Sequence, residues 1–319
     1  MKPKVAFYWC AACGGCEEAV VDLGEAILDV AGAVDIVLWP VALDFKKHHI
    51  EAMADGEIAA AFVNGAVRTS EQEEWAHLLR KKAQVIIAFG SCAQLGGIPG
   101  LGNFSNRAGI FQTVYRESPS TSNAAGVVPT PTHKENGFTV TLPLLHNTVR
   151  ALHQVIDVDY YIPGCPPTPQ LLADAVNALL SGKLPAKSTV LAPDHALCMD
   201  CPRKDSKPEK PMISEFKRPH EVLIDEEKCL LAQGLLCLGP ATRSGCGARC
   251  IEGNMPCTGC FGPTSRVRDY GAKALSGLAS LAASNEETEI AAILSKIPDP
   301  AGTFYRYSLP VSSLQRKRL

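Results

Sequence analysis

Thirteen cysteines are the residues of this 319-residue sequence best suited to chemistry. Thiolate sulfur binds iron-sulfur clusters and structural zinc, so many cysteines in a chain whose thiols stay reduced indicate metal binding rather than disulfides. Five of them lie in the first 190 residues, and eight lie within the 63 residues from Cys198 to Cys260. The sequence therefore predicts two cysteine-rich regions that bind metal.

The start of the chain bears on whether these thiols stay reduced. Lysines at positions 2 and 4 followed by an apolar run give the outline of a short signal peptide. Cleavage near Ala12 would, however, remove a segment that reads as a strand leading into a cysteine loop, and no twin-arginine pair stands near the N-terminus. We therefore expect a cytoplasmic protein with reduced thiols.

The cysteines of the first group each follow a predicted strand. Cys10, Cys13 and Cys16 follow one strand, Cys92 follows a second within Gly90-Ser91-Cys92, and Cys165 follows a third within Pro163-Gly164-Cys165-Pro166-Pro167. Because the carboxyl ends of parallel strands share one edge, these thiols are expected to converge there, and four of them would complete a cluster site. Ordinary buried cysteines are the alternative for Cys92 and Cys165. The first three cysteines imitate a ferredoxin run without its fourth cysteine, so one of the three is spare.

The elements that must position this group alternate between strands and helices. Short apolar runs predict buried strands of a parallel sheet at Val5–Trp9, Val34–Trp39, Ile58–Val63, Gln84–Phe89 and Val158–Ile162. Helical spacing predicts helices over Glu17–Ala31, Ser70–Lys82 and Thr168–Leu180, with Ser70 and Glu73 as a capping box. A proline- and serine-rich segment from Asn103 to Gly137 predicts a long loop. The pattern indicates an α/β fold of the flavodoxin-like type.

Past residue 190 the regular periodicity fades, and the composition boundary predicts two domains, 1–188 and 189–319. The second is expected to be an irregular, cysteine-rich unit organised by metal, ending in a helix or helix pair within Val267–Ile297. Its eight cysteines suffice for two four-ligand sites: Cys198, Cys201, Cys229, Cys237, Cys246, Cys250, Cys257 and Cys260. Two structural zincs are the alternative to two clusters. The uneven spacing and the absence of an obvious histidine pattern favour thiolate-bound iron.

Composition excludes several classes of partner. Lysine and arginine total 31 against 33 acidic residues, for a net charge of −2, so no overall basic field would attract nucleic acid. No uninterrupted apolar run reaches the length that a membrane helix needs, because Asp22, Glu25 and Asp29 interrupt the most hydrophobic helical region. We expect a chain that neither spans a bilayer nor binds a polyanion.

Taken together, these motifs resemble the small, electron-transferring subunit of nickel-iron hydrogenases over nearly the whole chain. The motifs are Cys13-Gly14-Gly15-Cys16-Glu17, Gly90-Ser91-Cys92, Pro163-Gly164-Cys165-Pro166-Pro167, Cys201-Pro202-Arg203, Cys237-Leu238-Gly239-Pro240 and Pro256-Cys257-Thr258-Gly259-Cys260. Cysteine at position 198, where exported members carry histidine, is typical of the cytoplasmic methyl-viologen-reducing, F420-non-reducing branch, whose members associate with heterodisulfide reductase.

The resemblance implies three 4Fe-4S clusters and assigns their ligands. A proximal cluster would use Cys13, Cys16, Cys92 and Cys165, a distal cluster Cys198, Cys201, Cys229 and Cys237, and a medial cluster Cys246, Cys250, Cys257 and Cys260. Cys10 is then not a ligand. Cys250 is the least secure assignment, because exported relatives often lack the fourth medial ligand. His195 imitates the exported His-x-x-Cys pattern, but Cys201-Pro202-Arg203 is the better anchor.

The resemblance also implies a division of labour. A partner large subunit would hold the nickel-iron centre and cleave hydrogen, and this chain would conduct the electrons to a further iron-sulfur subunit and to heterodisulfide reductase. No catalytic residue is expected here; Glu17, beside Cys16, is a candidate proton relay, with stabilisation of a helix N-terminus as the plainer interpretation. Two other classes remain: an electron-transfer subunit of a complex I-like oxidoreductase, and a zinc-stabilised interaction protein.

Overall fold

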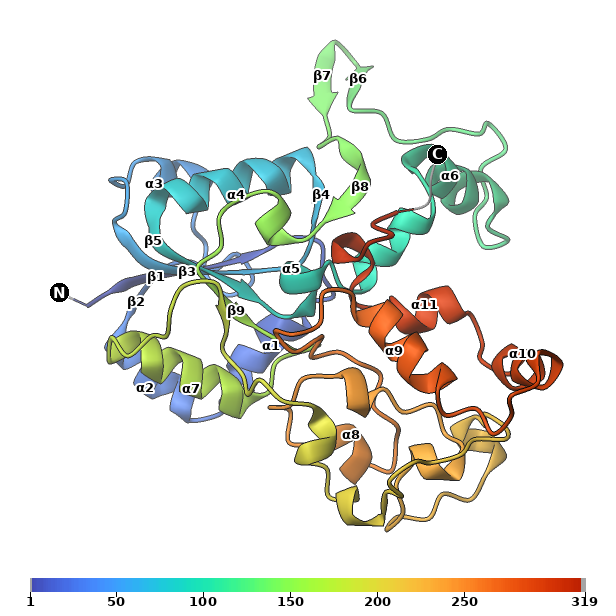
Figure 1. Cartoon of the computed structure of the whole chain (residues 1–319). Coiled ribbons are helices and arrows are strands. Elements are labelled where there is room, and N and C mark those ends of the chain that lie inside the picture. The colour runs from blue at the N-terminus through green and yellow to red at the C-terminus, as the bar shows by residue number, and fades with distance from the viewer. Residues whose placement is uncertain (1, 317–319) are drawn as a thin grey trace.

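Six parallel strands form the central sheet, and all five predicted strands are among them (Figure 1). The computed structural model describes residues 2–316. The strands are β1 (Lys4–Trp9), β2 (Asp35–Leu38), β3 (Ile58–Asn64), β5 (Ala83–Phe89), β9 (Tyr160–Ile162) and β10 (Thr189–Val190). Their order across the sheet, β2-β1-β3-β5-β9-β10, is that of a flavodoxin-like fold, which confirms the predicted class. The sixth strand, β10, lies just past residue 188, so the sheet extends slightly beyond the predicted boundary.

Two hydrophobic layers enclose this sheet because the side chains of each strand alternate between its faces. On β1, Ala6 and Tyr8 belong to one core cluster, while Val5 and Phe7 belong to the other. Helix α4 (Ser70–Lys82) and the short α3 (Lys47–Glu51) cover the first face. Helices α1 (Gly15–Val21), α2 (Ala26–Ala33) and α7 (Pro169–Leu180) cover the second face, as Figure 1 shows.

The helix predicted over Glu17–Ala31 is wrong as a single element. The chain forms α1 and α2 instead, separated by a turn in which Gly24 has a φ of +60°, a left-handed conformation that cannot continue a right-handed helix. The capping box of α4 lies one residue earlier than predicted. Thr69 is the N-cap, and its hydroxyl accepts from the backbone N–H of Gln72 at 3.3 Å, while the Gln72 side chain accepts from the Thr69 N–H at 3.0 Å.

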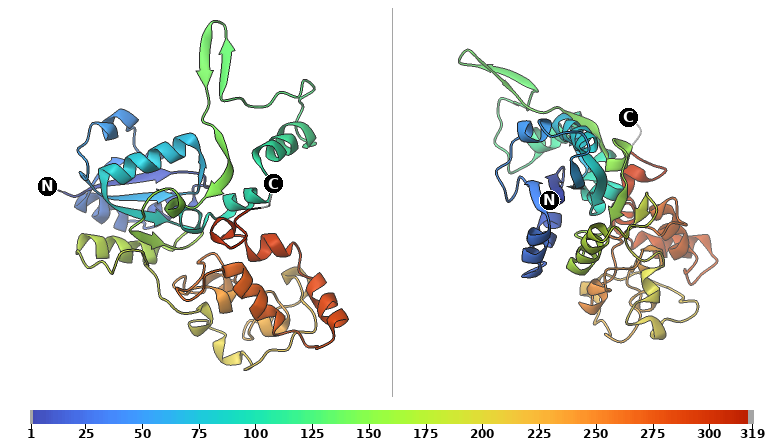
Figure 2. Two further views of the ribbon diagram at one scale, coloured as in Figure 1. Left: turned by 45° about the horizontal axis from the view of Figure 1, so that its top comes forward. Right: turned by 90° about the vertical axis from the view of Figure 1, so that its left-hand side faces the viewer.

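The loop predicted from Asn103 to Gly137 is confirmed only in part: residues 118–131 are irregular, but the rest of the segment contains regular structure. It holds α6 (Arg107–Gln112), a π-helical turn (Thr113–Glu117) and the strand β6 (Thr132–Glu135), which pairs with β7 (Phe138–Thr141). The hairpin turn is Asn136-Gly137, whose positive φ values of 49° and 83° are typical of a two-residue hairpin. The hairpin projects from the body in every view of Figures 1 and 2, and all its strand residues are exposed.

Two short strands, β4 (Val67–Thr69) and β8 (Leu145–Arg150), form a separate antiparallel pair that joins this segment to the sheet. The chain beyond residue 190 is mostly irregular, with single helical turns and the short α8 (Arg249–Glu252). The helix pair predicted within Val267–Ile297 is present as α9 (Tyr270–Ala279) and α10 (Glu287–Ser295), and a third helix, α11 (Pro300–Phe304), follows it. The 3-10 turns of the chain are Ile98–Phe104, Leu152–Gln154, Leu197–Met199, Lys204–Ser206, Pro219–Glu221, Leu231–Gln233, Gly239–Ala241 and Leu309–Val311. Among residues 2–316, no helix is both long and apolar enough to cross a membrane.

A partly buried ionic network ties α4 to the start of β9. The carboxylate of Asp159 accepts from the guanidinium of Arg80 at 2.6 Å, from the ammonium of Lys187 at 2.6 Å and from the backbone N–H of Ile86 at 2.8 Å. Burial alone would raise the pKa of Asp159, but the hydrogen bonds from Lys187, Ile86 and Arg80 outweigh it and lower that pKa. The folded state therefore holds this carboxylate ionised.

We expect Asp159→Ala to lower the apparent free energy of unfolding by about 3 kcal/mol, because it leaves buried donors without an acceptor. Because folding lowers the pKa of Asp159, its stabilisation is present at neutral pH and is lost as pH falls through the folded pKa, below the usual range for aspartate. Urea unfolding under anaerobic conditions measures this difference. Lys187→Ala is the control: its side chain is 71% exposed, and we expect a loss below about 1 kcal/mol. Equal losses in both variants would contradict the prediction.

Candidate metal centres

Four cysteines from three loops meet at the carboxyl edge of the sheet. Cys13 and Cys16 follow β1, Cys92 follows β5 and Cys165 follows β9, as the strand positions predicted. Burial raises the pKa of Cys16, and the nearby thiols of the other three cysteines raise it further. Burial, with Cys165 and Cys13, likewise raises the pKa of Cys92 to about 12. The structure thus brings together all four residues assigned to the proximal site.

Glycines keep the space around these sulfurs open. At Gly90, whose φ is +87°, an added Cβ would lie 2.3 Å from the Sγ of Cys16; at Gly97, with a φ of +56°, it would lie 2.4 Å from the Sγ of Cys92. The backbone N–H of Gly15 donates to the Sγ of Cys13 at 3.5 Å, and the backbone of Ile98 opposes the rise in the pKa of Cys92. Sulfurs surrounded by bare backbone and amide donors are typical of iron-sulfur ligation.

Cys10 is the spare cysteine of the first loop. It is buried in the core cluster that holds Tyr8, on the opposite face of the sheet from the cluster that holds Cys16. Burial alone raises the pKa of its thiol to about 12. The structure therefore separates Cys10 from the other four.

The distal group, Cys198, Cys201, Cys229 and Cys237, also assembles. Burial raises the pKa of Cys198 to about 12, and the nearby Cys237, Cys201 and Cys229 raise it too, while Lys207 opposes them. An added Cβ at Gly239 would lie 3.4 Å from the Sγ of Cys198 and 3.6 Å from that of Cys237. The backbone of this glycine therefore lies beside both thiols.

Arg203 holds the loops of the distal group in place. Its buried guanidinium donates to the carbonyl oxygens of Asp225 at 3.2 Å and Ile251 at 3.1 Å, and to the side-chain oxygen of Asn254 at 2.9 Å. The residue directly follows Cys201-Pro202, so these contacts fix the position of that ligand loop against two others.

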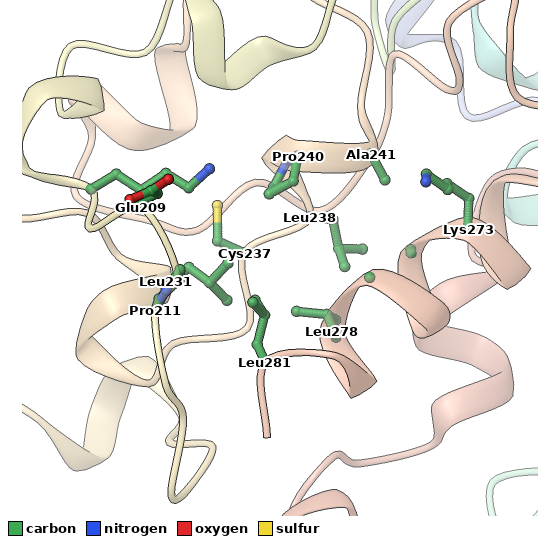
Figure 3. A pocket seen from close by; sticks show the side chains of 13 residues that line it. Glu209, Pro211, Leu231, Cys237, Leu238, Pro240, Ala241, Lys273, Leu278 and Leu281 are labelled. Atoms are coloured by element: carbon green, nitrogen blue, oxygen red, sulfur yellow. The ribbon is translucent and has the colours of Figure 1, made fainter. Parts of the chain in front are cut away.

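A cavity of about 280 Å³ borders the distal group (Figure 3). Lys207, Glu209 and Lys273 line its polar side, and leucines from the loop and from α9 line the rest. In Figure 3 the sulfur of Cys237 points away from Leu231 and Leu281. Cys237 thus has apolar side chains on one side and the other distal thiols within electrostatic reach.

The medial group encloses a cavity of about 220 Å³. Its lining includes all four assigned thiols, Cys246, Cys250, Cys257 and Cys260, together with Cys165 of the proximal group. Burial raises the pKa of Cys260 to about 12, and the thiols of Cys246, Cys165 and Cys250 contribute. Cys250 is exposed but lines the same cavity as the other three.

Two hydrogen bonds join the three groups in series. The hydroxyl of Ser91, next to Cys92, donates to the carbonyl oxygen of Cys260, so a proximal loop contacts the medial one. The N–H of Leu238, next to Cys237, donates to the carbonyl oxygen of Cys257 at 2.9 Å, so the distal loop contacts the medial one. The medial group therefore lies between the other two.

His195 has a different partner. Its imidazole pairs with the carboxylate of Asp200 at 2.7 Å, and Ser244 donates to the same carboxylate. The interaction is local to the loop and occupies the ring nitrogen Nε2.

The donor chemistry fits iron-sulfur clusters. Within residues 2–316, no three His, Cys, Asp or Glu side chains converge closely enough to hold a single metal ion. A four-iron cluster spaces its thiolates more widely than one ion does, and all three groups consist of thiols among amide donors. Thr242 and Tyr270, two buried hydroxyl residues beside Cys257, were missed by the sequence reasoning, because no local motif marks them.

Comparison with known proteins agrees with this arrangement. The family model described as NADH ubiquinone oxidoreductase, 20 Kd subunit, matches residues 13–179, a range that includes all four proximal cysteines and ends before the second cysteine region. A curated relative, the iron-sulfur subunit of the F420-non-reducing hydrogenase of Archaeoglobus profundus, is 41% identical over 99% of both chains.

Solved structures extend the comparison to the fold. A chain of an NAD+-reducing [NiFe]-hydrogenase is 29% identical, with a TM-score of 0.50 over 58% of this chain and 94% of its own. A chain of the [NiFeSe] hydrogenase from Desulfovibrio vulgaris Hildenborough, 18% identical, has a TM-score of 0.51 over 82% of this chain and 94% of its own, which shows a shared fold. Because this chain is 41% identical to the Archaeoglobus relative over 99% of both chains, it belongs to the family of F420-non-reducing hydrogenase iron-sulfur subunits.

Proposed function

We propose that this chain carries electrons from hydrogen oxidation at a partner's nickel-iron centre through three 4Fe-4S clusters to a downstream acceptor such as heterodisulfide reductase. The observation that carries the proposal is the series of hydrogen bonds that connects Ser91, next to Cys92, to Cys260, and Leu238, next to Cys237, to Cys257. A series of neighbouring thiolate sites is what electron transfer across a protein requires. Each cluster supplies a one-electron redox centre when bound.

The residues of each site have defined tasks in this proposal. Cys13, Cys16, Cys92 and Cys165 hold the proximal cluster within residues 1–188; Cys198, Cys201, Cys229 and Cys237 hold the distal cluster, and Cys246, Cys250, Cys257 and Cys260 the medial cluster, within residues 189–319. Burial keeps water away from Cys16, Cys92, Cys237 and Cys257, one or two ligands of each site. The chain holds and tunes the clusters, while hydrogen cleavage takes place on the large subunit.

The exposed part of the proximal edge supports the position of that large subunit. Cys13 is exposed, and the neighbouring Trp9 is 40% exposed, beside Gly14. A redox cluster at this edge would lie open to oxygen unless a partner covered it. We therefore place the catalytic subunit against this edge, and the further iron-sulfur subunit near the distal group, in the cytoplasm.

A metal analysis tests the proposal. Protein purified anaerobically from its source with its partners should contain about twelve irons per chain with matching sulfide, and a nickel-containing companion. Two zincs and little iron would overturn it in favour of a structural zinc protein. A complex I-like role is the second candidate, since the family model matches residues 13–179. The cysteine region beyond residue 190 lies outside that match and favours the hydrogenase role.

Glu17 is the candidate proton relay beside the proximal site. Its carboxylate is buried and accepts hydrogen bonds from the indole N–H of Trp39 and the side-chain N–H of Asn64. Burial raises the pKa of Glu17, although these two donors oppose it. The side chain thus points into the protein rather than to solvent at the helix N-terminus.

We expect Glu17→Gln to slow hydrogen turnover while the iron content stays unchanged, because the amide keeps the shape but cannot exchange a proton. Hydrogen-dependent dye reduction by the whole complex, with iron per chain, measures both quantities. Glu18→Gln is the matched control, since Glu18 is its exposed neighbour in the same helical turn, and it should leave both unchanged. Unchanged turnover in Glu17→Gln would remove the relay hypothesis.

A further inference from the structure

A pair of buried hydroxyl groups lies against the medial thiol of Cys257. The Oγ1 of Thr242 is 3.6 Å from the Sγ of Cys257 and 2.9 Å from the hydroxyl oxygen of Tyr270. Thr242 is 1% exposed, Tyr270 4% and Cys257 6%, so no bulk water reaches this group. Buried hydroxyls must find partners within the protein, and here those partners lie beside a thiol of the medial site.

The position of Tyr270 is tightly determined. It is the first residue of α9, whose N-cap Asp269 accepts from the backbone N–H of Ala272 at 3.0 Å. Its hydroxyl also lies against Gly259 in the Cys257-to-Cys260 loop, where an added Cβ would be only 2.1 Å from the hydroxyl oxygen. A bare glycine with a φ of +96° is therefore what allows the tyrosine to reach this loop.

The hydrogen bonds of Thr242 and Tyr270 differ between the free thiol of Cys257 and its metal-bound thiolate. While Cys257 is a thiol, its S–H donates to Thr242, and the Thr242 hydroxyl donates to the carbonyl oxygen of Leu238 at 2.7 Å. That carbonyl has a second donor, the backbone N–H of Ala241 at 3.1 Å. When Cys257 binds as a thiolate, the Thr242 hydroxyl can therefore turn to the sulfur without leaving the carbonyl unpaired. Tyr270 then donates to Thr242 and strengthens its bond to sulfur.

We propose that the Tyr270–Thr242 hydroxyl pair donates a hydrogen bond to the Sγ of Cys257 and thereby raises the reduction potential of the cluster at the medial site. The inference rests on the proposed function. A reduced cluster carries more negative charge on its sulfurs than an oxidised one, so a donor to sulfur stabilises the reduced form more. Thr242 touches the sulfur, and Tyr270 is a positioning residue that acts through it.

Redox titration of the anaerobic complex, followed by electron paramagnetic resonance, tests the proposal. Tyr270→Phe removes one oxygen and keeps the ring, so we expect the medial midpoint potential to shift negative while the proximal and distal potentials stay in place. Thr242→Val should produce a larger negative shift, and Thr242→Ser, which keeps the hydroxyl, should restore the wild-type value. Tyr305→Phe is the control, because the pKa of Tyr305 is raised by burial and by Asp269 and by none of the thiols, and it should not move the potential.

The outcomes separate this inference from the proposed function. Wild-type protein without a medial iron-sulfur signal would overturn the proposed function itself. A fully loaded Tyr270→Phe variant with an unshifted medial potential would overturn only the role of the hydroxyl pair. If Thr242→Val loses iron, Tyr270→Phe still decides the question, since it removes one oxygen and keeps the ring.

Discussion

Replacing Cys16 by alanine is expected to remove about four irons per chain and to abolish hydrogen-dependent dye reduction by the complex. Cys16 is buried, and its thiol interacts with those of Cys92, Cys165 and Cys13, so no other side chain of the group can take its place. Without the first cluster in the series, electrons from the partner have no entry to this chain. Iron, sulfide and dye-reduction rates on anaerobically purified complex measure the effect.

Cys10→Ala is the matched control for this variant. Cys10 lies six residues before Cys16 and is equally buried, but it packs in the core on the other face of the sheet. We expect full iron content and full activity, with at most a modest loss of stability from the missing sulfur. If Cys10→Ala lost about four irons while Cys16→Ala kept them, Cys10 rather than Cys16 would be the ligand of the proximal cluster.

Gly90→Ala is expected to block the proximal site without removing any ligand. Its Cβ would lie 2.3 Å from the Sγ of Cys16, and the backbone at φ +87° and ψ 165°, a region adopted almost only by glycine, adds a cost on the order of 1–3 kcal/mol. Because the sulfur must move to relieve the clash, we expect a loss of about four irons per chain, as for Cys16→Ala. Iron analysis and the electron paramagnetic resonance signal of the proximal cluster measure the loss.

A second glycine isolates the steric part of this effect. Gly137 has nearly the same φ, +83°, but an added Cβ there meets nothing within 4 Å. Gly137→Ala therefore carries the backbone cost alone, and we expect normal iron content and activity. If Gly90→Ala retained all its iron, the close approach of backbone to sulfur would not be a requirement of the site.

The sequence by itself determined the framework of the proximal site. Buried apolar runs predicted the strands that precede Cys13, Cys92 and Cys165, and the rule that parallel strands end at one edge predicted that these thiols meet. Both inferences depend on local pattern and on strand direction, which the residues of each segment carry themselves. The glycines beside the thiols could also be read from the sequence, because they belong to the same local motifs.

Local pattern failed where a neighbouring segment or a single backbone angle decided the outcome. Gly24 divides a continuous helical pattern into α1 and α2. The hairpin around Asn136-Gly137 lies in a segment whose prolines and serines indicated a loop, although its Asn-Gly turn was a usable signal.

Only the tertiary structure decided how distant residues meet in the second region. The hydrogen bonds from Ser91 to Cys260 and from Leu238 to Cys257 join residues that are 169 and about 20 positions apart, and they set the order of the three groups. Tyr270 reaches Cys257 through Thr242 because α9 packs against the cysteine loops, a contact that no spacing in the sequence encodes. The spacing of residues in the sequence identifies the candidate ligands and the ends of the strands. Contacts between irregular loops depend instead on how the whole chain packs.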